Sequence, residues 1–95
     1  MNKKPNSSRC EAMYQAMLSM QSVEECMRFM DDLCTITELQ AMEQRFQVAQ
    51  CLAHGMNYNE ILEQTGASSA TISRVNRSLR YGSGGYDIAL SRIEG

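Results

Sequence analysis

The sequence predicts an all-α protein of about six helices. Apolar residues recur along it at steps of three and four, which is the spacing that one face of a helix requires. No segment alternates apolar and polar residues as a half-buried strand does, and the one proline, Pro5, precedes the first periodic segment. We therefore expect a flexible N-terminal arm at residues 1–9 and a single helical domain at residues 10–95.

The first two helices are expected at residues 10–20 and 22–33. Ser22 and Glu25 have the spacing of a capping box, in which the hydroxyl and the carboxylate each accept a backbone N–H group at the start of a helix. Apolar residues at helical spacing are Cys10, Met13, Tyr14, Met17 and Leu18 in the first helix and Val23, Cys26, Met27, Met30 and Leu33 in the second. We expect the second set to form a buried face.

The third helix, expected at residues 36–54, is the longest. Thr35 and Glu38 repeat the capping-box pattern at its start, and Gly55 provides a left-handed stop at its end. His54 stands at the C-terminal end, where the negative end of the helix dipole suits an imidazole. The apolar residues of this helix are Leu39, Met42, Phe46, Ala49 and Leu52.

A helix-turn-helix motif follows, with helices expected at residues 58–65 and 69–81. Gly66 provides the tight turn between them, and Asn57 and Ser68 are suited to begin the two helices as N-caps. The positions at which two such helices must touch are occupied by Ile61, Ile72 and Val75. All three are apolar, as this packing requires.

The C-terminal third of the chain carries the positive charge. Residues 1–66 hold five basic and nine acidic residues, whereas residues 67–95 hold four basic and two acidic residues. Within that part a last short helix is expected at residues 86–93, after glycines at three of the four positions 82–85. Positive charge that is concentrated in a chain of net charge −2 indicates an anion-binding surface.

The second helix of the motif has the composition of a DNA-reading helix. Small and hydroxyl side chains at its N-terminal end allow close entry into a major groove, and arginines at three-residue steps fan out where they can grip flanking phosphates. The residues expected to contact DNA are Ser68, Ser69, Ala70, Thr71, Ser73, Arg74, Arg77 and Arg80, together with Asn59 of the preceding helix. The same face would also suit a solvated surface or a helix-turn-helix that binds protein.

The segment NYNEILEQTGASSATISRVNRSLRYG resembles the DNA-binding half of the tryptophan repressor family, whose members also have a Gly-Ala, an Ala-Thr-Ile, an arginine and a Ser-Leu along it. The likeness extends upstream through CTITELQAMEQRFQVAQCLAHG and covers roughly residues 10–81. The glycine-rich RYGSGGY is most similar to the YerC/YecD group of small tryptophan-repressor-like proteins. The resemblance implies an intertwined homodimer in which the first three helices of both protomers share one core. It also implies a two-fold operator with half-sites roughly 34 Å apart.

The resemblance also implies a pocket for a co-repressor. In the tryptophan repressor two arginines sandwich the indole ring, and a threonine and a serine help to bind the amino acid. The residues that match these positions are Thr35, Arg45, Arg74 and Ser78, the first two after a one-residue gap near Met56. Val75, however, stands where the repressor has a glycine that leaves room for the ring, so we expect tryptophan not to be the co-repressor.

Phosphate contacts are expected from a small set of side chains, because Asn59 and Leu62 stand where the tryptophan repressor has basic residues on the first helix of the motif. That set is Arg74, Arg77 and Arg80, joined by the arm residues Lys3, Lys4 and Arg9. If only the three arginines of each protomer engage, a dimer neutralises about six phosphates, and the log–log salt slope is roughly −5.

The sequence contains no pattern of a catalytic or metal site. It has no nucleophile with a base, no phosphate-cradling loop with a lysine and no metal-spaced carboxylate cluster, so we expect no enzymatic activity and no cofactor. The four cysteines are 16, 8 and 17 residues apart, which fits buried reduced thiols better than a metal site. Without a signal peptide or a membrane-spanning run, the protein is expected in the cytoplasm.

The sequence therefore predicts a sequence-specific, DNA-binding transcriptional regulator, a repressor rather than an activator, that binds double-stranded DNA as a homodimer through the helix at residues 69–81. An alternative is an adaptor that keeps the helix-turn-helix fold but binds a protein partner through its acidic first half and its Met-rich helices. A third is a regulator that responds to an unidentified small effector through Arg45 and Arg74.

Overall fold

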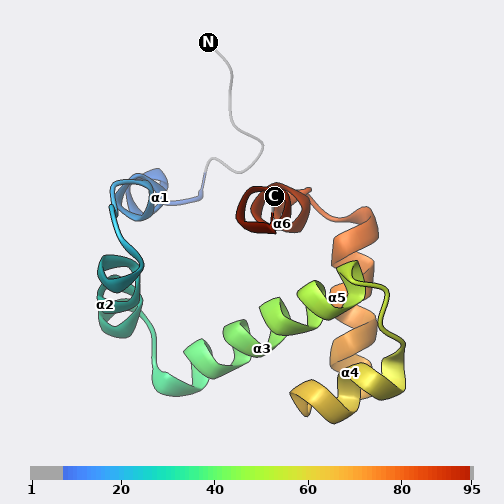
Figure 1. The fold of residues 1–95 in the computed structure, drawn as a ribbon. Helices are drawn as coiled ribbons and strands as arrows, with labels where there is room; N and C mark the ends of the chain where they lie inside the picture. The colour runs from blue at the N-terminus through green and yellow to red at the C-terminus, as the bar shows by residue number, and fades with distance from the viewer. Residues whose placement is uncertain (1–7, 95) are drawn as a thin grey trace. The chain divides into compact units, whose positions relative to one another are not determined.

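The computed structural model describes residues 8–94, which form six helices and no strand (Figure 1). The helices are α1 (Glu11–Leu18), α2 (Val23–Leu33), α3 (Ile36–Ala53), α4 (Tyr58–Thr65), α5 (Ser69–Tyr81) and α6 (Gly85–Glu94). The all-α prediction is confirmed. Lys3 and Lys4 of the expected arm lie outside the described residues. Among the described helices none combines the length and the apolar run that a membrane crossing requires.

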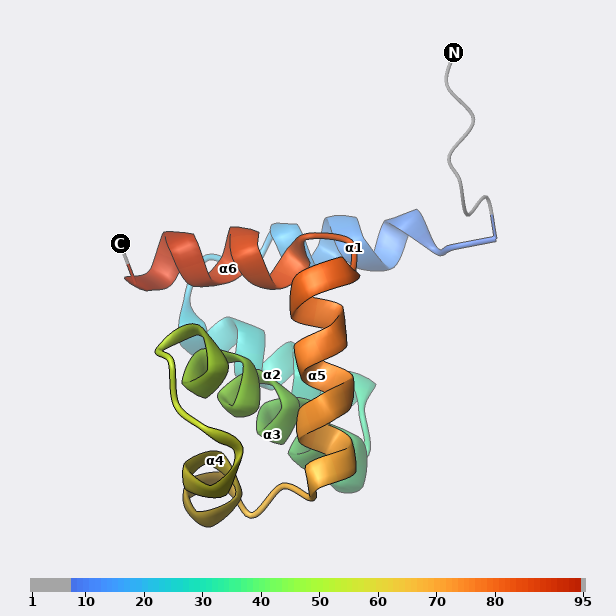
Figure 2. The ribbon, with the colours of Figure 1, turned by 90° about the vertical axis from the view of Figure 1, so that its right-hand side faces the viewer.

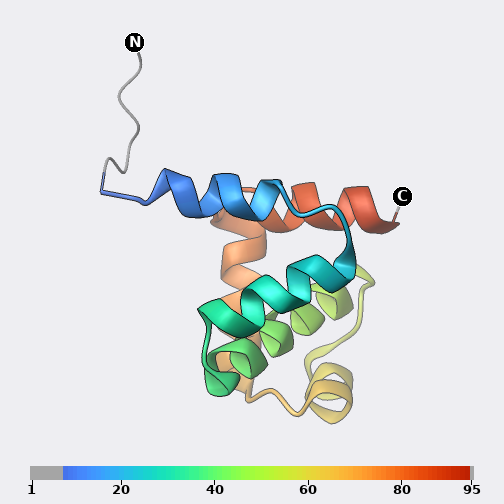
Figure 3. The ribbon, with the colours of Figure 1, turned by 90° about the vertical axis from the view of Figure 1, so that its left-hand side faces the viewer.

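The described residues fall into two compact units, one that ends at Ile36 and one that begins at Thr37. Figure 3 shows α1 and α2, the two helices of the first unit. In the first unit α2 begins after Ser22, whose Oγ accepts the backbone N–H of Glu25 at 3.0 Å. The carboxylate of Glu25 accepts the N–H of Gln21 at 2.9 Å. The predicted cap is therefore present, with its return bond displaced by one residue.

α1 is shorter than the expected range 10–20. Beyond Leu18 the N–H of Met20 donates to the carbonyl of Met17, three residues back, so the last turn tightens and the α-helix ends. Arg9, expected in the arm, lies against α1: its Nη2 donates to the hydroxyl of Tyr14 at 2.7 Å, and its guanidinium is 5.2 Å from the centre of the Tyr14 ring.

The first unit has no buried side chain in either helix. Val23 and Met27, on the face of α2 predicted to be buried, are 77% and 62% exposed. That prediction is wrong for the single chain, because two helices of 8 and 11 residues cannot enclose a core of their own. The apolar faces of this unit are open to a partner.

The four cysteines are free and differ in exposure. Cys51 on α3 is buried, as predicted, whereas Cys10 and Cys26 are exposed and Cys34 is half-buried. These three cysteines belong to the unit without a core, and for them the prediction of buried thiols is wrong.

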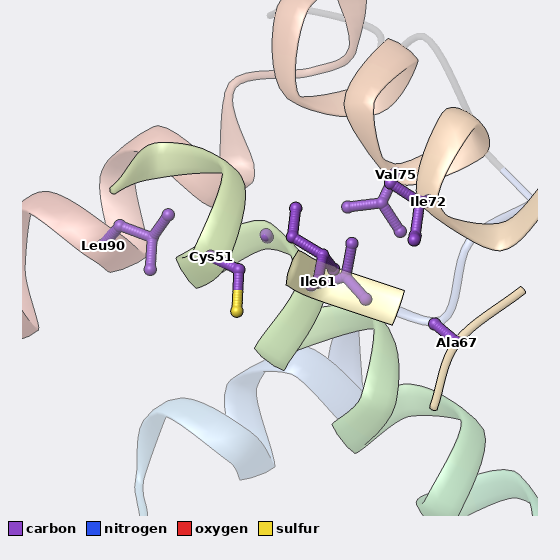
Figure 4. Close-up of a cluster of buried hydrophobic side chains, with 8 residues drawn as sticks. Cys51, Ile61, Ala67, Ile72, Val75 and Leu90 are labelled. Atoms are coloured by element: carbon purple, nitrogen blue, oxygen red, sulfur yellow. The ribbon is translucent and has the colours of Figure 1, made fainter. Parts of the chain in front are cut away.

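The second unit encloses a core between α3, α4, α5 and α6 (Figure 4). Its buried residues are Val48, Ala49 and Cys51 of α3, Ile61 of α4, Ala67 of the turn, Ile72 and Val75 of α5, and Leu90 of α6. Ile61, Ile72 and Val75, the predicted helix contacts, are at most 1% exposed, so this prediction is confirmed. Burial of each such side chain stabilises the unit by about 1.5–3 kcal/mol, and together the three hold α4 and α5 on α3.

α6 crosses the C-terminal end of α5 (Figure 2) and is tied to the end of α3. Oε1 of Glu94 lies 2.9 Å from Nε2 of His54, and Oε2 of Glu94 accepts a bond of 3.2 Å from the side-chain amide of Gln50. The hydrogen bond from His54 is the main reason that the pKa of Glu94 lies below its ordinary value of 4.5, with a smaller contribution from Gln50. His54 thus has a carboxylate partner in addition to its place at the helix end.

Gly82 ends α5 at a close approach of the backbone. Its N–H donates to the carbonyl of Ser78 at 2.9 Å, and a Cβ added at Gly82 would press on that carbonyl oxygen and lie 3.3 Å from the Cα of Ser78. A Cβ added at Gly85, the first residue of α6, would have no atom within 4 Å. Glycine is therefore required for space at the first position and not at the second.

We expect Gly82→Ala to destabilise the second unit by about 1–3 kcal/mol, because the added methyl group overpacks against backbone that cannot rotate away. Urea unfolding at one fixed protein concentration measures the effect. Gly85→Ala is the matched control, and it should be neutral or stabilise by about 0.4–1 kcal/mol, since it only reduces the freedom of the unfolded chain. Equal stability of the two variants would contradict this account.

The lowered pKa of Glu94 predicts a stability contribution that depends on pH. Because the folded-state pKa is the lower one, the contribution is present above the ordinary value of 4.5 and is lost as pH falls through the folded-state pKa. Wild-type protein should therefore exceed Glu94→Gln in stability near neutral pH, and the gap should close in acid. Thermal unfolding of both proteins, measured from neutral to acid pH, checks this difference in stability. Glu63→Gln is the matched control, since it neutralises an exposed carboxylate of α4 that has no hydrogen-bond or ion-pair partner among residues 8–94.

Candidate DNA-binding surface

α4, the turn and α5 form the helix-turn-helix. Oδ1 of Asn57 accepts the N–H of Glu60, and Oε1 of Glu60 accepts the N–H of Asn57, each at 2.9 Å, so a complete capping box begins α4. Gly66 ends α4 with φ of +73°, in the left-handed region that favours glycine. Oγ of Ser68 accepts the N–H of Thr71 at 3.1 Å and begins α5. The predicted caps and turn are confirmed.

The hydroxyl groups at the start of α5 are partly used by this cap. The hydroxyl of Ser68 also donates to Oγ1 of Thr71 at 3.1 Å, and Thr71 is half-buried. Ser69, Ala70 and Ser73 are exposed, and within the described part of the chain no hydrogen bond involves their side chains. The open surface at the N-terminal end of α5 therefore consists of these three small residues.

Arg74, Arg77 and Arg80 lie on the outer side of α5, and all three are exposed. Successive residues of a helix are about 100° apart around its axis. Arg77 therefore projects opposite to Ile72 and Val75, which face the core, and the other two arginines flank it by about 60° on either side.

The charges of these arginines are not neutralised by the surrounding chain. Residues 64–86 include no acidic residue. Within residues 8–94 neither Arg74 nor Arg77 has a hydrogen-bond or ion-pair partner, and Nε of Arg80 donates to a neutral group, Oδ1 of Asn76, at 3.1 Å. The outer side of α5 thus presents three uncompensated positive charges, as a surface for a polyanion requires.

α4 contributes little positive charge to this surface. Asn59, the residue of α4 expected to contact DNA, is exposed. Beside it the helix carries Glu60 and Glu63 and no basic residue, and Leu62 is 47% exposed. Within the helix-turn-helix, any attraction for phosphates must therefore come from α5.

The residues matched to the co-repressor pocket differ in their placement. Val75 is 1% exposed and belongs to the core, Arg45 is half-buried, and Arg74 is exposed. Thr35 belongs to the other compact unit. Ser78 lines a cavity of about 510 Å³, whose other lining residues are Phe46, Gly82, Ser83, Gly85, Tyr86 and Ala89. Within the second unit the structure thus surrounds Ser78 with small residues and two aromatic rings.

Two features of this region were not predicted from the sequence. The cavity joins Phe46 and Tyr86, which are 40 positions apart, so no local pattern connects them. The bond between Asn76 and Arg80 does have a sequence signal, because residues four apart are neighbours on a helix surface.

Comparisons with known proteins agree with the helix-turn-helix. The family model of the Trp repressor protein matches residues 8–94. The uncharacterized protein YerC of Bacillus subtilis (strain 168) is 49% identical over 84 residues, which are 88% of this chain and 81% of that protein.

Two solved structures have the same fold. One, a candidate Trp repressor from Staphylococcus aureus, has a TM-score of 0.86 and 41% identity, and the match covers 98% of this chain and 96% of that chain. The other, a TrpR-like protein from Eubacterium eligens ATCC 27750, has a TM-score of 0.86 and 46% identity, with 94% and 95% covered. Since the family model matches all the described residues and these relatives are similar over most of their length, the chain belongs to the Trp repressor family.

Proposed function

We propose that this chain is a sequence-reading, DNA-binding transcriptional regulator that acts as a homodimer and represses rather than activates. The observation that carries the proposal is the outer side of α5, with three exposed arginines, small side chains at its N-terminal end and no acidic residue. Membership of the Trp repressor family, whose proteins bind DNA as dimers, supports it.

In this proposal α5 enters the major groove. Ser69, Ala70 and Ser73 permit close approach to the base edges, and Ala70 can contact a thymine methyl group. Arg77 points toward the floor of the groove, while Arg74 and Arg80 face its two walls. Polar phosphate contacts come from Asn59, from Thr71 and from Ser68, whose hydroxyl would turn from Thr71 to the phosphate. Ser68 and Thr71 stand at the N-terminal end of α5, where the helix dipole attracts anions.

The homodimer is supported by the apolar side chains that the single chain leaves exposed. In the first unit these are Tyr14, Met17, Leu18, Val23, Met27, Leu33 and Ile36. A second copy would remove them from water and supply the core that this unit lacks. The same apolar faces would be the contact surface of a protein-binding adaptor. A measurement of DNA binding distinguishes the regulator from the adaptor, because only the regulator binds DNA.

We further infer that tryptophan is not the co-repressor. Val75 is packed into the core, and its side chain stands where the tryptophan repressor has a glycine. The packing of this valine holds α5 on α3 without a ligand. We also propose that Arg45, Arg74 and Ser78 bind a small effector other than tryptophan. A rise in Tm on addition of that effector would test this role.

Selection from a random-sequence DNA pool at two salt concentrations tests the proposed function. We expect enrichment of a palindromic site whose affinity falls with a log–log salt slope of roughly −4, because Arg74 and Arg80 of the two protomers neutralise about four phosphates while Arg77 faces the bases. Arg77→Ala should abolish the enrichment. The matched control is Arg92→Ala, which removes an exposed arginine of α6 and should leave the selected site unchanged. Folded wild-type protein that enriches no site would favour the protein-binding adaptor.

Val75→Gly tests the account of the blocked pocket. The variant should lose about 2–4 kcal/mol of stability, because a buried side chain is removed from a helix. It should also gain a rise in Tm on addition of tryptophan that wild-type protein does not show. Val48→Gly is the control, since it removes an equally buried valine from α3 and should gain no response. If the Tm of Val75→Gly does not rise with tryptophan, the side chain of Val75 is not what prevents tryptophan from binding.

A further inference from the structure

Asn76 and Arg80 are joined on the surface of α5. Nε of Arg80 donates to Oδ1 of Asn76 at 3.1 Å across one helical turn. Asn76 is half-buried, at the border of the side that packs on the core, whereas Arg80 is exposed. The bond itself is exposed to solvent, and it holds the guanidinium beside a neutral amide.

This bond leaves the binding end of Arg80 free. A guanidinium has five N–H donors, and the bond from Nε uses one of them. The end formed by Nη1 and Nη2 can still donate two parallel bonds to a phosphate. Because Asn76 is neutral, the positive charge is retained, and because Arg80 is restrained before binding, less side-chain freedom is lost on binding.

Arg74 and Arg77 differ from Arg80 in this respect. Neither has a partner among residues 8–94. Arg77 is also the central one of the three, about 60° from each neighbour around the helix axis. A central, unrestrained side chain suits the varied edges of bases, whereas a restrained side chain on the flank suits the regular backbone.

We propose that Asn76 is a positioning residue that orients Arg80 as a phosphate clamp on one wall of the groove, while Arg77 reads the bases. The proposal rests on the proposed DNA-binding function and assigns separate roles within it. Arg80 supplies affinity that is independent of sequence, and Arg77 supplies discrimination.

A double-mutant cycle tests the role of Asn76. Binding to the duplex recovered by the selection is titrated over a range of salt for wild-type protein, Asn76→Ala, Arg80→Ala and the double variant. Asn76→Ala should weaken binding about threefold to tenfold with an unchanged salt slope, because the phosphate contact persists but must be ordered on binding. Arg80→Ala should reduce the slope by about 0.9 per lost phosphate contact, or about 1.8 for a dimer. The double variant should match Arg80→Ala.

Controls separate positioning from a general effect on the fold. Gln64→Ala removes an exposed amide from α4 and should leave affinity unchanged. In the free protein, NMR should show slower solvent exchange of the Arg80 Nε–H than of the Arg77 Nε–H, and Asn76→Ala should remove the difference. Unfolding curves of Asn76→Ala should show a stability equal to or slightly above that of wild-type protein, because alanine is the better helix former and the lost hydrogen bond is exposed.

The outcomes distinguish this proposal from the proposed function. If a duplex is recovered and Asn76→Ala weakens binding equally with and without Arg80, Asn76 does not act through Arg80, and its positioning role is overturned while DNA binding stands. If wild-type protein recovers no duplex, both the DNA-binding function and the phosphate clamp are overturned. The NMR exchange rates of the Arg80 Nε–H would not change that conclusion.

Discussion

The packing of Ile61, Ile72 and Val75 on Val48 and Ala49 of α3 is the contact on which the second unit depends. These side chains are at most 1% exposed, and an interior packed this closely responds to the change of a single methylene. With the short turn between α4 and α5, this contact sets the angle between the two helices in the structure. The outward direction of the three arginines therefore follows from the packing of these core side chains.

Val75 is the side chain from which the proposed loss of a tryptophan response would follow. In the tryptophan repressor the corresponding position is a glycine, and a bound amino acid fills the space beside it. Here the valine occupies its own place in the core and braces α5 directly. A small effector that acts through Arg45, Arg74 and Ser78 would therefore have to bind without the space that the glycine provides in the tryptophan repressor.

Local features of the fold could be predicted from the sequence, and features that join distant segments could not. Asn57 and Ser68 begin helices because their side chains accept N–H groups three residues away, an interaction that a single sequence displays. The bond from His54 to Glu94 spans 40 positions and has no sequence signature. The exposure of Val23 was missed for a related reason, since periodicity identifies an apolar face but not the molecule that covers it. For the candidate site, composition and spacing predicted the arginines, whereas the restraint of one of them by Asn76 depends on side-chain conformation.

The first unit, which buries no side chain of α1 or α2, has a consequence for how such a regulator would be controlled. If a second copy supplies the missing core, completion of the fold and pairing of the chains become one reaction. The amount of paired protein then rises with the square of the free chain concentration when chains are scarce. Synthesis and degradation would act as the switch, and a small change in expression would become a larger change in operator occupancy.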